Sequence, residues 1–119
     1  MGKVISFDES GKFDIYTLRT DVASGKRPLR VTSHAQVEAF KDGLLLADLH
    51  YVFEYGEVIE VYPDDQRGLL YSMLPEHNLP AHIVVEDTPR EGIIVTAYIP
   101  DKGQWTANVR RKGSKGKKR

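Results

Sequence analysis

Two histidines occupy positions where their side chains could take part in acid–base chemistry. His34 follows Ser33 at the start of a predicted helix. Unpaired backbone amides and the positive end of the helix dipole favour an anion there and lower the basicity of an imidazole. A neutral His34 could therefore accept a proton as a general base. The alternative is that His34 caps its helix or packs at the edge of a sheet.

His82 lies in a predicted strand in which polar and apolar positions alternate. Ala81, Ile83 and Val85 fall on one face, and His82 falls on the other. Thr96 and Tyr98 alternate in the same way on the following strand, so cross-strand pairing could bring Thr96 or Tyr98 beside His82. The resulting group could donate and accept protons. The alternative is a half-exposed sheet face on which a histidine and a tyrosine are merely hydrogen-bonded.

Cations and aromatic rings that could bind a nucleic acid are few. Arg67 lies in a predicted turn, where a solvated loop residue is the alternative. Trp105 could stack on a base, or it could cover the core. The C-terminal residues Arg110, Arg111 and Lys112 begin a basic run that could contact phosphates.

The composition excludes several classes of protein. The 119 residues include no Cys, which removes thiolate nucleophiles, disulfides and Cys-ligated metals. The spacing of Glu76, His77 and His82 is not that of a metal site, and we expect neither a metal nor a cofactor. No Gly-rich phosphate loop or Gly-x-Ser-x-Gly elbow is present, so nucleotide hydrolysis and acyl transfer have no support. Without an apolar leader or a membrane span, a cytoplasmic protein is expected.

The net charge of zero conceals two parts of opposite charge. Residues 110–119 hold seven of the 17 basic side chains and no acidic one. The preceding 109 residues hold all 17 acidic side chains and ten basic ones, a net charge of minus seven. A basic run interrupted by Gly and Ser has no apolar side chain to pack, so a disordered tail is predicted. The tail could bind phosphate, aid solubility or fold back onto the acidic body.

The first half of the chain predicts one hairpin and two helices. Val4–Phe7 and Lys12–Leu18 predict an N-terminal hairpin, and Arg19–Arg30 predicts a connecting loop. Ser33 and Gln36 fit a capping box that opens a helix, which Asp42-Gly43 ends. The apolar spacing in Leu44–Tyr55 predicts a second helix closed by Gly56 at the C′ position.

The second half of the chain predicts four strands joined by short turns, and such turns favour antiparallel neighbours. The strands cover Glu57–Tyr62, Gly68–Leu74, Ala81–Glu86 and Gly92–Ile99. The expected fold is α+β, with two short helices followed by a four-stranded, mainly antiparallel sheet packed on them. We divide the chain into an N-terminal hairpin and loop (1–31), an α+β domain (32–106) and a basic tail (107–119).

Four motifs in this order resemble those of the DUF4258 family of small, mostly bacterial domains. They are Ser33-His34-Ala35, the joint Gly56–Glu60, Pro80–Val85, and Ile94–Pro100 with Trp105. The family is grouped by fold with RelE-like toxins and the BECR ribonucleases, so the resemblance implies a RelE-like fold. Where the family has an Arg four residues after the first His, this chain has Glu38. If that Arg neutralises phosphate, Glu38 would repel it, which would indicate lost activity or a cation placed elsewhere.

The resemblance implies a metal-independent ribonuclease, such as the toxin of a toxin–antitoxin system. His34 would then be the base, and Tyr98 or His82 the acid or a phosphate donor, with Thr96 beside them. The basic tail would steer the protein toward RNA or the ribosome, and an antitoxin would be a partner. The alternative is a catalytically inactive module that binds a protein or RNA through a sheet edge or the N-terminal hairpin.

Overall fold

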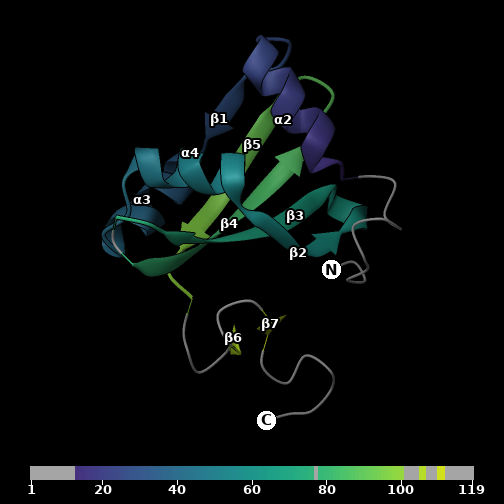
Figure 1. The fold of residues 1–119 in the computed structure, drawn as a ribbon. Coiled ribbons are helices and arrows are strands. Elements are labelled where there is room, and N and C mark those ends of the chain that lie inside the picture. Colours follow the sequence, from purple (N-terminus) through teal and green to yellow (C-terminus); the bar gives the residue numbers. More distant parts are fainter. Residues whose placement is uncertain (1–12, 77, 101–104, 107–109, 112–119) are drawn as a thin grey trace.

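A computed structural model describes residues 13–76 and 78–100, and the backbone of residues 105–106 and 110–111. Figure 1 shows the arrangement of its helices and strands. Within the described residues the elements, in chain order, are α2 (Ile15–Ser24), β1 (Leu29–Val31), α3 (Ser33–Lys41), α4 (Leu46–Tyr55), β2 (Glu57–Tyr62), the 3-10 turn η1 (Pro63–Asp65), β3 (Arg67–Leu74), β4 (Leu79–Asp87), β5 (Gly92–Tyr98), β6 (Trp105–Thr106) and β7 (Arg110–Arg111). The predicted α+β class is confirmed.

The main sheet has five strands in the order β1-β5-β4-β3-β2. β2, β3, β4 and β5 form the predicted antiparallel meander, and their bounds lie within two residues of the predicted ones. β1 adds a parallel fifth strand at the β5 edge, so the sheet is mixed. The register shifts at two places, between Val58 and Glu60 on β2 and between Val84 and Val85 on β4.

Within the described residues, the prediction of an N-terminal hairpin is wrong. The segment expected to form its second strand leads into helix α2 instead, while the expected first strand lies outside the described residues. Ile15 and Leu18 are both buried and lie three residues apart, which is helical spacing. The carboxylate of Asp14 caps the helix by accepting from the amides of Tyr16 and Thr17. Gly25 then ends α2 in the left-handed conformation, with φ of 82°.

The predicted loop from Arg19 to Arg30 is also wrong. Its first part is the end of α2, and its last residues begin β1. The three residues of β1 pair with the start of β5, more than sixty positions later in the chain. A three-residue strand held by so distant a partner leaves no periodic pattern in its own sequence.

Helices α3 and α4 confirm the two predicted helices, with changes at three ends. Thr32, and not Ser33, is the N-cap of α3, and its side chain accepts from the amide of Ala35. α4 begins at Leu46, two residues later than predicted. Gly56 follows α4 in an extended conformation, so it is not a left-handed C′ glycine. A Cβ there would lie 2.4 Å from the Val52 carbonyl oxygen, so close backbone approach explains the glycine.

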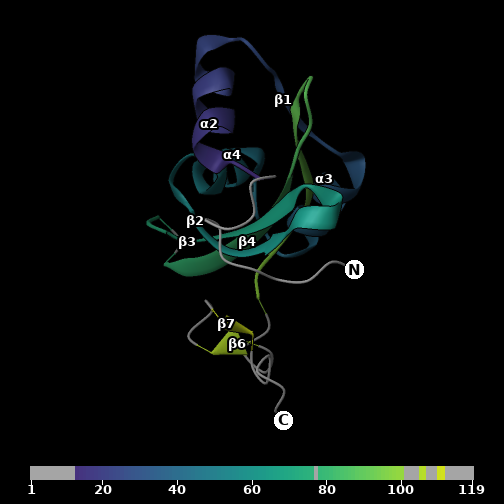
Figure 2. The ribbon, with the colours of Figure 1, turned by 90° about the vertical axis from the view of Figure 1, so that its right-hand side faces the viewer.

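One continuous core lies between the helices and one face of the sheet. Figures 1 and 2 show α2 and α4 on one side of β2, β3 and β4. The helices contribute, among others, Leu18, Ala35 and Phe53, and the strands contribute Leu70 and Ile83. The predicted packing of helices on a single sheet face is therefore confirmed.

A buried arginine ties α2 to the far end of β4. Arg27 is only 8% exposed and donates to the carboxylates of Asp21 (2.7 Å) and Asp87 (2.6 Å) and to the Thr88 carbonyl (2.6 Å). Burial acts to lower the pKa of Arg27, but its hydrogen bonds to Asp87 and Asp21 outweigh this and raise the pKa. Removing the guanidinium would leave two carboxylates without their cation in a largely dry site.

The basic tail lies mostly outside the described residues. Arg110–Arg111 forms a two-residue strand, β7, that pairs with β6. The predicted disorder of residues 107–119 stays a prediction, as do the roles suggested for Trp105, Arg110, Arg111 and Lys112.

The cap of α2 makes the stability of the fold depend on pH. The Thr17 hydroxyl, 2.7 Å from Asp14, and the backbone amides lower the pKa of Asp14 below its ordinary 3.8. A carboxyl with a lowered pKa stabilises the fold above its unfolded pKa, and this contribution is lost as the pH falls through its folded pKa. Asp14→Ala should therefore cost about 1 kcal/mol near neutral pH and less in acid. Urea unfolding of the unsubstituted protein and of Asp14→Ala, from acid to neutral pH, measures the difference between their free energies of unfolding.

Asp14→Asn is the matched control for the Asp14→Ala comparison. Asparagine is also a good N-cap residue but carries no charge. It should keep most of the stability at neutral pH and remove this part of the pH dependence. If Asp14→Ala were equally destabilising in acid and at neutral pH, the ionised cap would not be the cause.

Candidate functional site

A hollow of about 480 Å³ opens on the sheet face opposite the core. On β4, Val84 points to this face while Ile83 and Val85 point into the core. The hollow combines residues from α3, β2, η1, β3, β4 and β5, which are His34, Tyr62, Asp65, Arg67, Val84, Val95 and Thr96. Three residues selected from the sequence, His34, Arg67 and Thr96, thus line one cavity.

His34 reaches the hollow because the chain is fixed to β5 immediately before it. The Thr32 amide donates to the Ile94 carbonyl (3.1 Å), and the Thr32 hydroxyl donates to the Val95 carbonyl (3.4 Å). The same hydroxyl accepts from the Ala35 amide (3.0 Å) and caps α3. His34 follows in the first turn of α3 with an exposed side chain, while Ala35 is buried in the core. The imidazole is therefore open to a substrate in solution.

Arg67 brings a guanidinium to the hollow, but a carboxylate already holds it. It lies opposite Tyr62 on β2 and opposite Glu86 on β4. Its Nε and one terminal nitrogen both lie 3.1 Å from the same Glu86 oxygen. Because Asp65 also lines the cavity, the charge around the guanidinium is mixed. An incoming phosphate would have to compete with Glu86 for Arg67.

His82 and Tyr98 form a second group on the same sheet face. His82 is paired with Tyr98 across β4 and β5, and Val84 is paired with Thr96. The His82 Nδ1 lies 3.4 Å from the Tyr98 hydroxyl, and the ring of Tyr71 meets the imidazole edge-on. Two residues along a strand separate Tyr98 from Thr96 by roughly 7 Å, so this group borders the hollow.

The burial of His82 limits what it can do. His82 is 0% exposed, whereas Tyr98 is half-buried. A substrate from solution can therefore reach Tyr98 more readily than His82. The structure suits His82 to positioning the Tyr98 hydroxyl and not to touching a substrate itself.

Sequence reasoning missed the parts of the hollow that come from β2 and η1. These parts are Tyr62 and Asp65, which the sequence marks only as a strand end and a turn. The Tyr62 hydroxyl donates to the Glu60 carboxylate. Gln66 turns the chain back in the left-handed conformation, with φ of 57°, and this brings Tyr62 opposite Arg67. A polar turn between two strands gives no signal in the sequence that it borders a cavity.

Glu38, where the sequence resemblance leads us to expect an arginine, lies one helical turn after His34. Its carboxylate pairs with Lys41 at 3.4 Å. Residues four apart share a helix face, so a negative charge stands on the same side of α3 as the imidazole. Within the described residues, no group of three or more His, Asp or Glu side chains could hold a metal ion, and no helix is long and apolar enough to cross a membrane.

Comparison with known families identifies the domain. The model of the family described as "Domain of unknown function (DUF4258)" matches residues 31–99. The match covers more than half of the chain, so the protein belongs to this family. It begins at the end of β1 and extends just past β5, and it therefore includes His34, Arg67, His82, Thr96 and Tyr98. No curated protein and no solved structure matches the chain significantly.

The position of the α3 cap can be tested with two neighbouring substitutions. Thr32→Ala removes the hydroxyl that caps α3 and contacts β5, so it should lower the free energy of unfolding by about 1 kcal/mol. Ser33→Ala is the matched control and should change it by less than about 0.5 kcal/mol, because the Ser33 side chain is exposed. Chemical denaturation measures both values. A larger loss of stability for Ser33→Ala than for Thr32→Ala would mean that Ser33 is the N-cap of α3.

Proposed function

We propose that the protein is a metal-independent endoribonuclease of the RelE-like group and acts as the toxin of a toxin–antitoxin system. The observation that carries this proposal is the hollow in which an exposed imidazole (His34), a guanidinium (Arg67) and a hydroxyl (Thr96) meet. Its volume of about 480 Å³ lies within the range of small-ligand sites, roughly 300–1,000 Å³. These are the groups that RNA cleavage needs when no metal takes part.

In the proposed reaction, the RNA chain is cut by its own 2′-hydroxyl. His34 accepts the 2′-hydroxyl proton, and the resulting oxygen attacks the adjacent phosphorus. Arg67 and Thr96 donate to the phosphate oxygens as negative charge builds up on them. Tyr98, positioned by His82, gives a proton to the departing 5′-oxygen. The products are a 2′,3′-cyclic phosphate and a free 5′-hydroxyl.

The charge distribution suggests how RNA would approach. The first 109 residues carry a net charge of minus seven and would repel a long polyanion. The seven positive charges of residues 110–119 would attract it. We therefore infer that the tail makes the first contact with RNA or the ribosome, and that binding weakens steeply with salt.

A second candidate function is a catalytically inactive module that binds RNA or protein. The observation in its favour is the ion pair between Arg67 and Glu86 at 3.1 Å, which occupies the cation that a phosphate would need. Asp65 lines the hollow and adds negative charge there. Glu38, one helical turn after His34, stands where a cation is expected from the sequence resemblance. In this case the hollow would not cleave RNA, and binding would depend on the tail.

Incubation of the purified protein with single-stranded and structured RNA in EDTA distinguishes the two functions. The proposal predicts cleavage that leaves 2′,3′-cyclic phosphate ends. His34→Ala should lower the rate by about a hundredfold or more, since positioned acid–base groups contribute roughly 10²–10⁴-fold. Arg67→Ala should lower it by about a hundredfold, and Tyr98→Phe should also slow cleavage. His50→Ala, an exposed histidine on α4 that does not line the hollow, is the matched control and should cleave normally.

The same samples show which alternative holds if the proposal is wrong. RNA that is bound but not cut, with binding lost on truncation after Val109, would indicate a tail-driven RNA-binding module. The absence of both binding and cleavage would indicate a protein partner. In the cell, induction without an antitoxin should slow growth, and His34→Ala should relieve that effect.

A further inference from the structure

The β2 edge of the sheet, opposite the edge formed by β1, carries a second feature with binding potential. β2 is the last strand in the order β1-β5-β4-β3-β2. Among the described strands, only β3 pairs with it. In a sheet, alternate residues of an edge strand direct their backbone donors and acceptors outward, where an extended chain can pair with them. The register shift at Ile59 bends this edge and favours a short partner over a long flat one.

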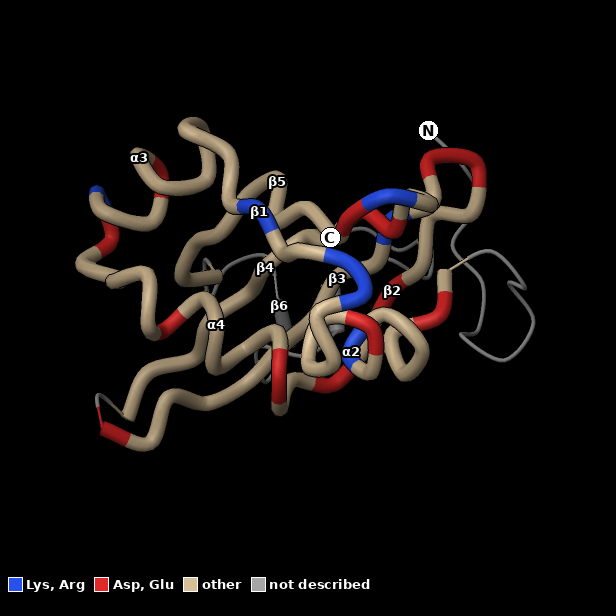
Figure 3. The backbone as a smooth tube through the Cα atoms, turned by 90° about the horizontal axis from the view of Figure 1, so that it is seen from above, with Lys and Arg blue, Asp and Glu red and all other residues tan. Residues whose placement is uncertain are grey.

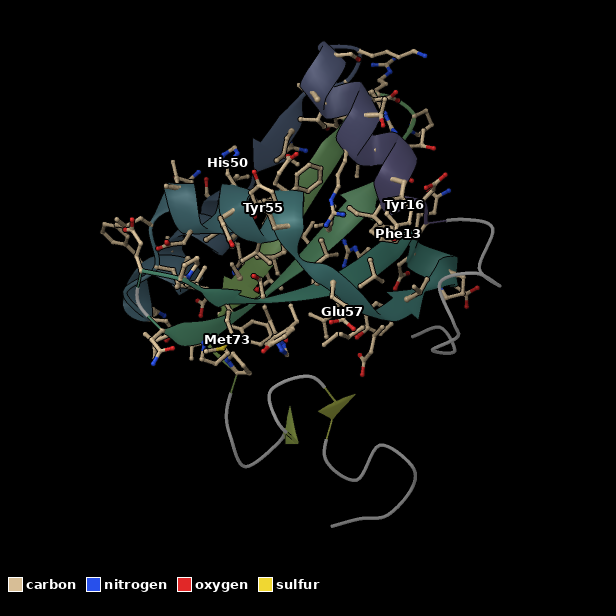
Figure 4. All side chains as sticks on the ribbon, viewed as in Figure 1. Phe13, Tyr16, His50, Tyr55, Glu57 and Met73 are labelled. Carbon is tan, nitrogen blue, oxygen red and sulfur yellow. The ribbon has the colours of Figure 1, made fainter. Side chains whose placement is uncertain are left out.

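A hollow of about 280 Å³ lies at the start of this edge strand. It is lined by Ile15, Tyr16 and Arg19 from α2, by Tyr55 and Gly56 at the end of α4, and by Glu57 and Val58 from β2. Figure 4 shows Tyr16 and Tyr55 reaching this region from two different helices, with Glu57 below them on β2.

Aromatic surface is unusually open around this second hollow. Tyr16 is 64% exposed and Tyr55 is 68% exposed. Tyr55 is also held in place by the ring of Tyr51, whose centroid lies 4.9 Å away. Two exposed rings on the rim of a hollow form an apolar site into which a partner's side chain can fit.

The base of this hollow is rigid. Arg19 donates from Nε to the Phe53 carbonyl (2.7 Å) and from a terminal nitrogen to the Gly56 carbonyl (2.6 Å). These bonds hold α2 against the C-terminal end of α4 and satisfy carbonyls that the helix itself leaves unpaired. The spacing between the two helix ends that carry Tyr16 and Tyr55 is therefore set by hydrogen bonds within the protein.

The charge along this edge selects the partner. Exposed carboxylates lie at Glu54, Glu57, Asp64 and Asp65, before, within and after β2, and the tube in Figure 3 marks such residues in red. The guanidinium of Arg19 donates to the two carbonyls and also interacts electrostatically with Glu54, so it offsets only part of this negative charge. Pairing of β2 with a second copy of itself would bring like charges together, which is unfavourable. A basic chain would be attracted.

We propose that this edge binds a short, extended, basic peptide segment of another protein. The segment adds a strand to β2, places one large apolar side chain between Tyr16 and Tyr55, and brings Lys or Arg side chains to Glu57 and Asp64. Backbone pairing supplies affinity, and the hollow and the carboxylates supply specificity. This surface lies on the opposite sheet edge from β1 and shares none of its lining residues with the His34 hollow.

The probe for this site is the heptapeptide Lys-Val-Lys-Phe-Lys-Val-Lys, compared with Glu-Val-Glu-Phe-Glu-Val-Glu. In titrations of the full-length ¹⁵N-labelled protein, the basic peptide should shift the amide signals of β2 and of Tyr16 and Tyr55. It should also slow hydrogen exchange of β2 amides. The acidic peptide should not bind.

Single substitutions sharpen the test. Glu57→Lys should weaken binding of the basic peptide by roughly threefold to tenfold, because it turns an attraction across the strands into a repulsion. Tyr55→Ala should weaken binding of the basic peptide by about fivefold, because it removes one wall of the hollow. His50→Ala, on the same helix but away from the hollow, should bind normally. RNA cleavage should be unchanged in all three variants. Peptide binding and RNA cleavage therefore test the peptide site and the proposed ribonuclease activity separately.

Three results would overturn the proposal. The first is equal binding of the basic and the acidic peptide. The second is a set of amide chemical-shift changes centred away from β2. The third is slow exchange of all β2 amides in the free protein, which would mean that the edge is already paired within the chain.

Discussion

The parallel pairing of β1 with β5 is the constraint on which the candidate site depends. Leu29, Arg30 and Val31 align with Gly92, Ile93 and Ile94, and the ladder is extended at both ends by bonds from the Gly92 amide to Pro28 and from the Thr32 amide to Ile94. These few bonds fix the point at which the chain leaves the sheet. The next residues begin α3, so His34 is placed beside β5 by backbone geometry.

The remaining parts of the site are placed by the meander, which folds through contacts between neighbouring strands. Arg67, Thr96 and Tyr98 take their positions from the pairing of β3, β4 and β5. The site is therefore assembled from one long-range strand pairing, β1 with β5, and two short-range ones, β3 with β4 and β4 with β5. Arg27 supports the long-range contact, because it precedes β1 and anchors α2 to Asp87 at the end of β4. The two proposed binding surfaces have no lining residue in common, although β2 contributes Tyr62 to one and Glu57 and Val58 to the other.

The sequence predicts the second half of the fold well and the first residues poorly. The strands from Glu57 onward alternate clearly, and short turns leave little choice of topology. In contrast, Phe13, Ile15 and Thr17 alternate like a strand, although Ile15 and Leu18 also fit a helix. Packing of Leu18 against Gly92, where an added Cβ would lie 2.9 Å from a Leu18 methyl, settles the choice in the structure. A contact between such distant residues cannot be inferred from local periodicity.

The candidate site can be predicted only in part from the sequence, because local alternation is visible there and contacts between distant residues are not. Alternation along β4 and β5 indicates that His82 could lie beside Thr96 or Tyr98, and in the structure its cross-strand partner is Tyr98. The burial of His82 and the pairing of Arg67 with Glu86 depend on neighbouring strands and were not foreseen. The N-cap of α3 is Thr32, one residue before the predicted Ser33, and the Thr32 hydroxyl also contacts the Val95 carbonyl on β5, which local sequence does not reveal.

The proposed ribonuclease must bind RNA in the hollow between α3 and the sheet. The most direct test is an NMR titration of the full-length protein with a 2′-O-methyl oligoribonucleotide, which can bind but cannot be cut. We expect the largest chemical-shift changes at His34, Arg67 and Thr96, with smaller ones at Tyr98. Shifts confined to residues 110–119, with the hollow unchanged, would contradict it.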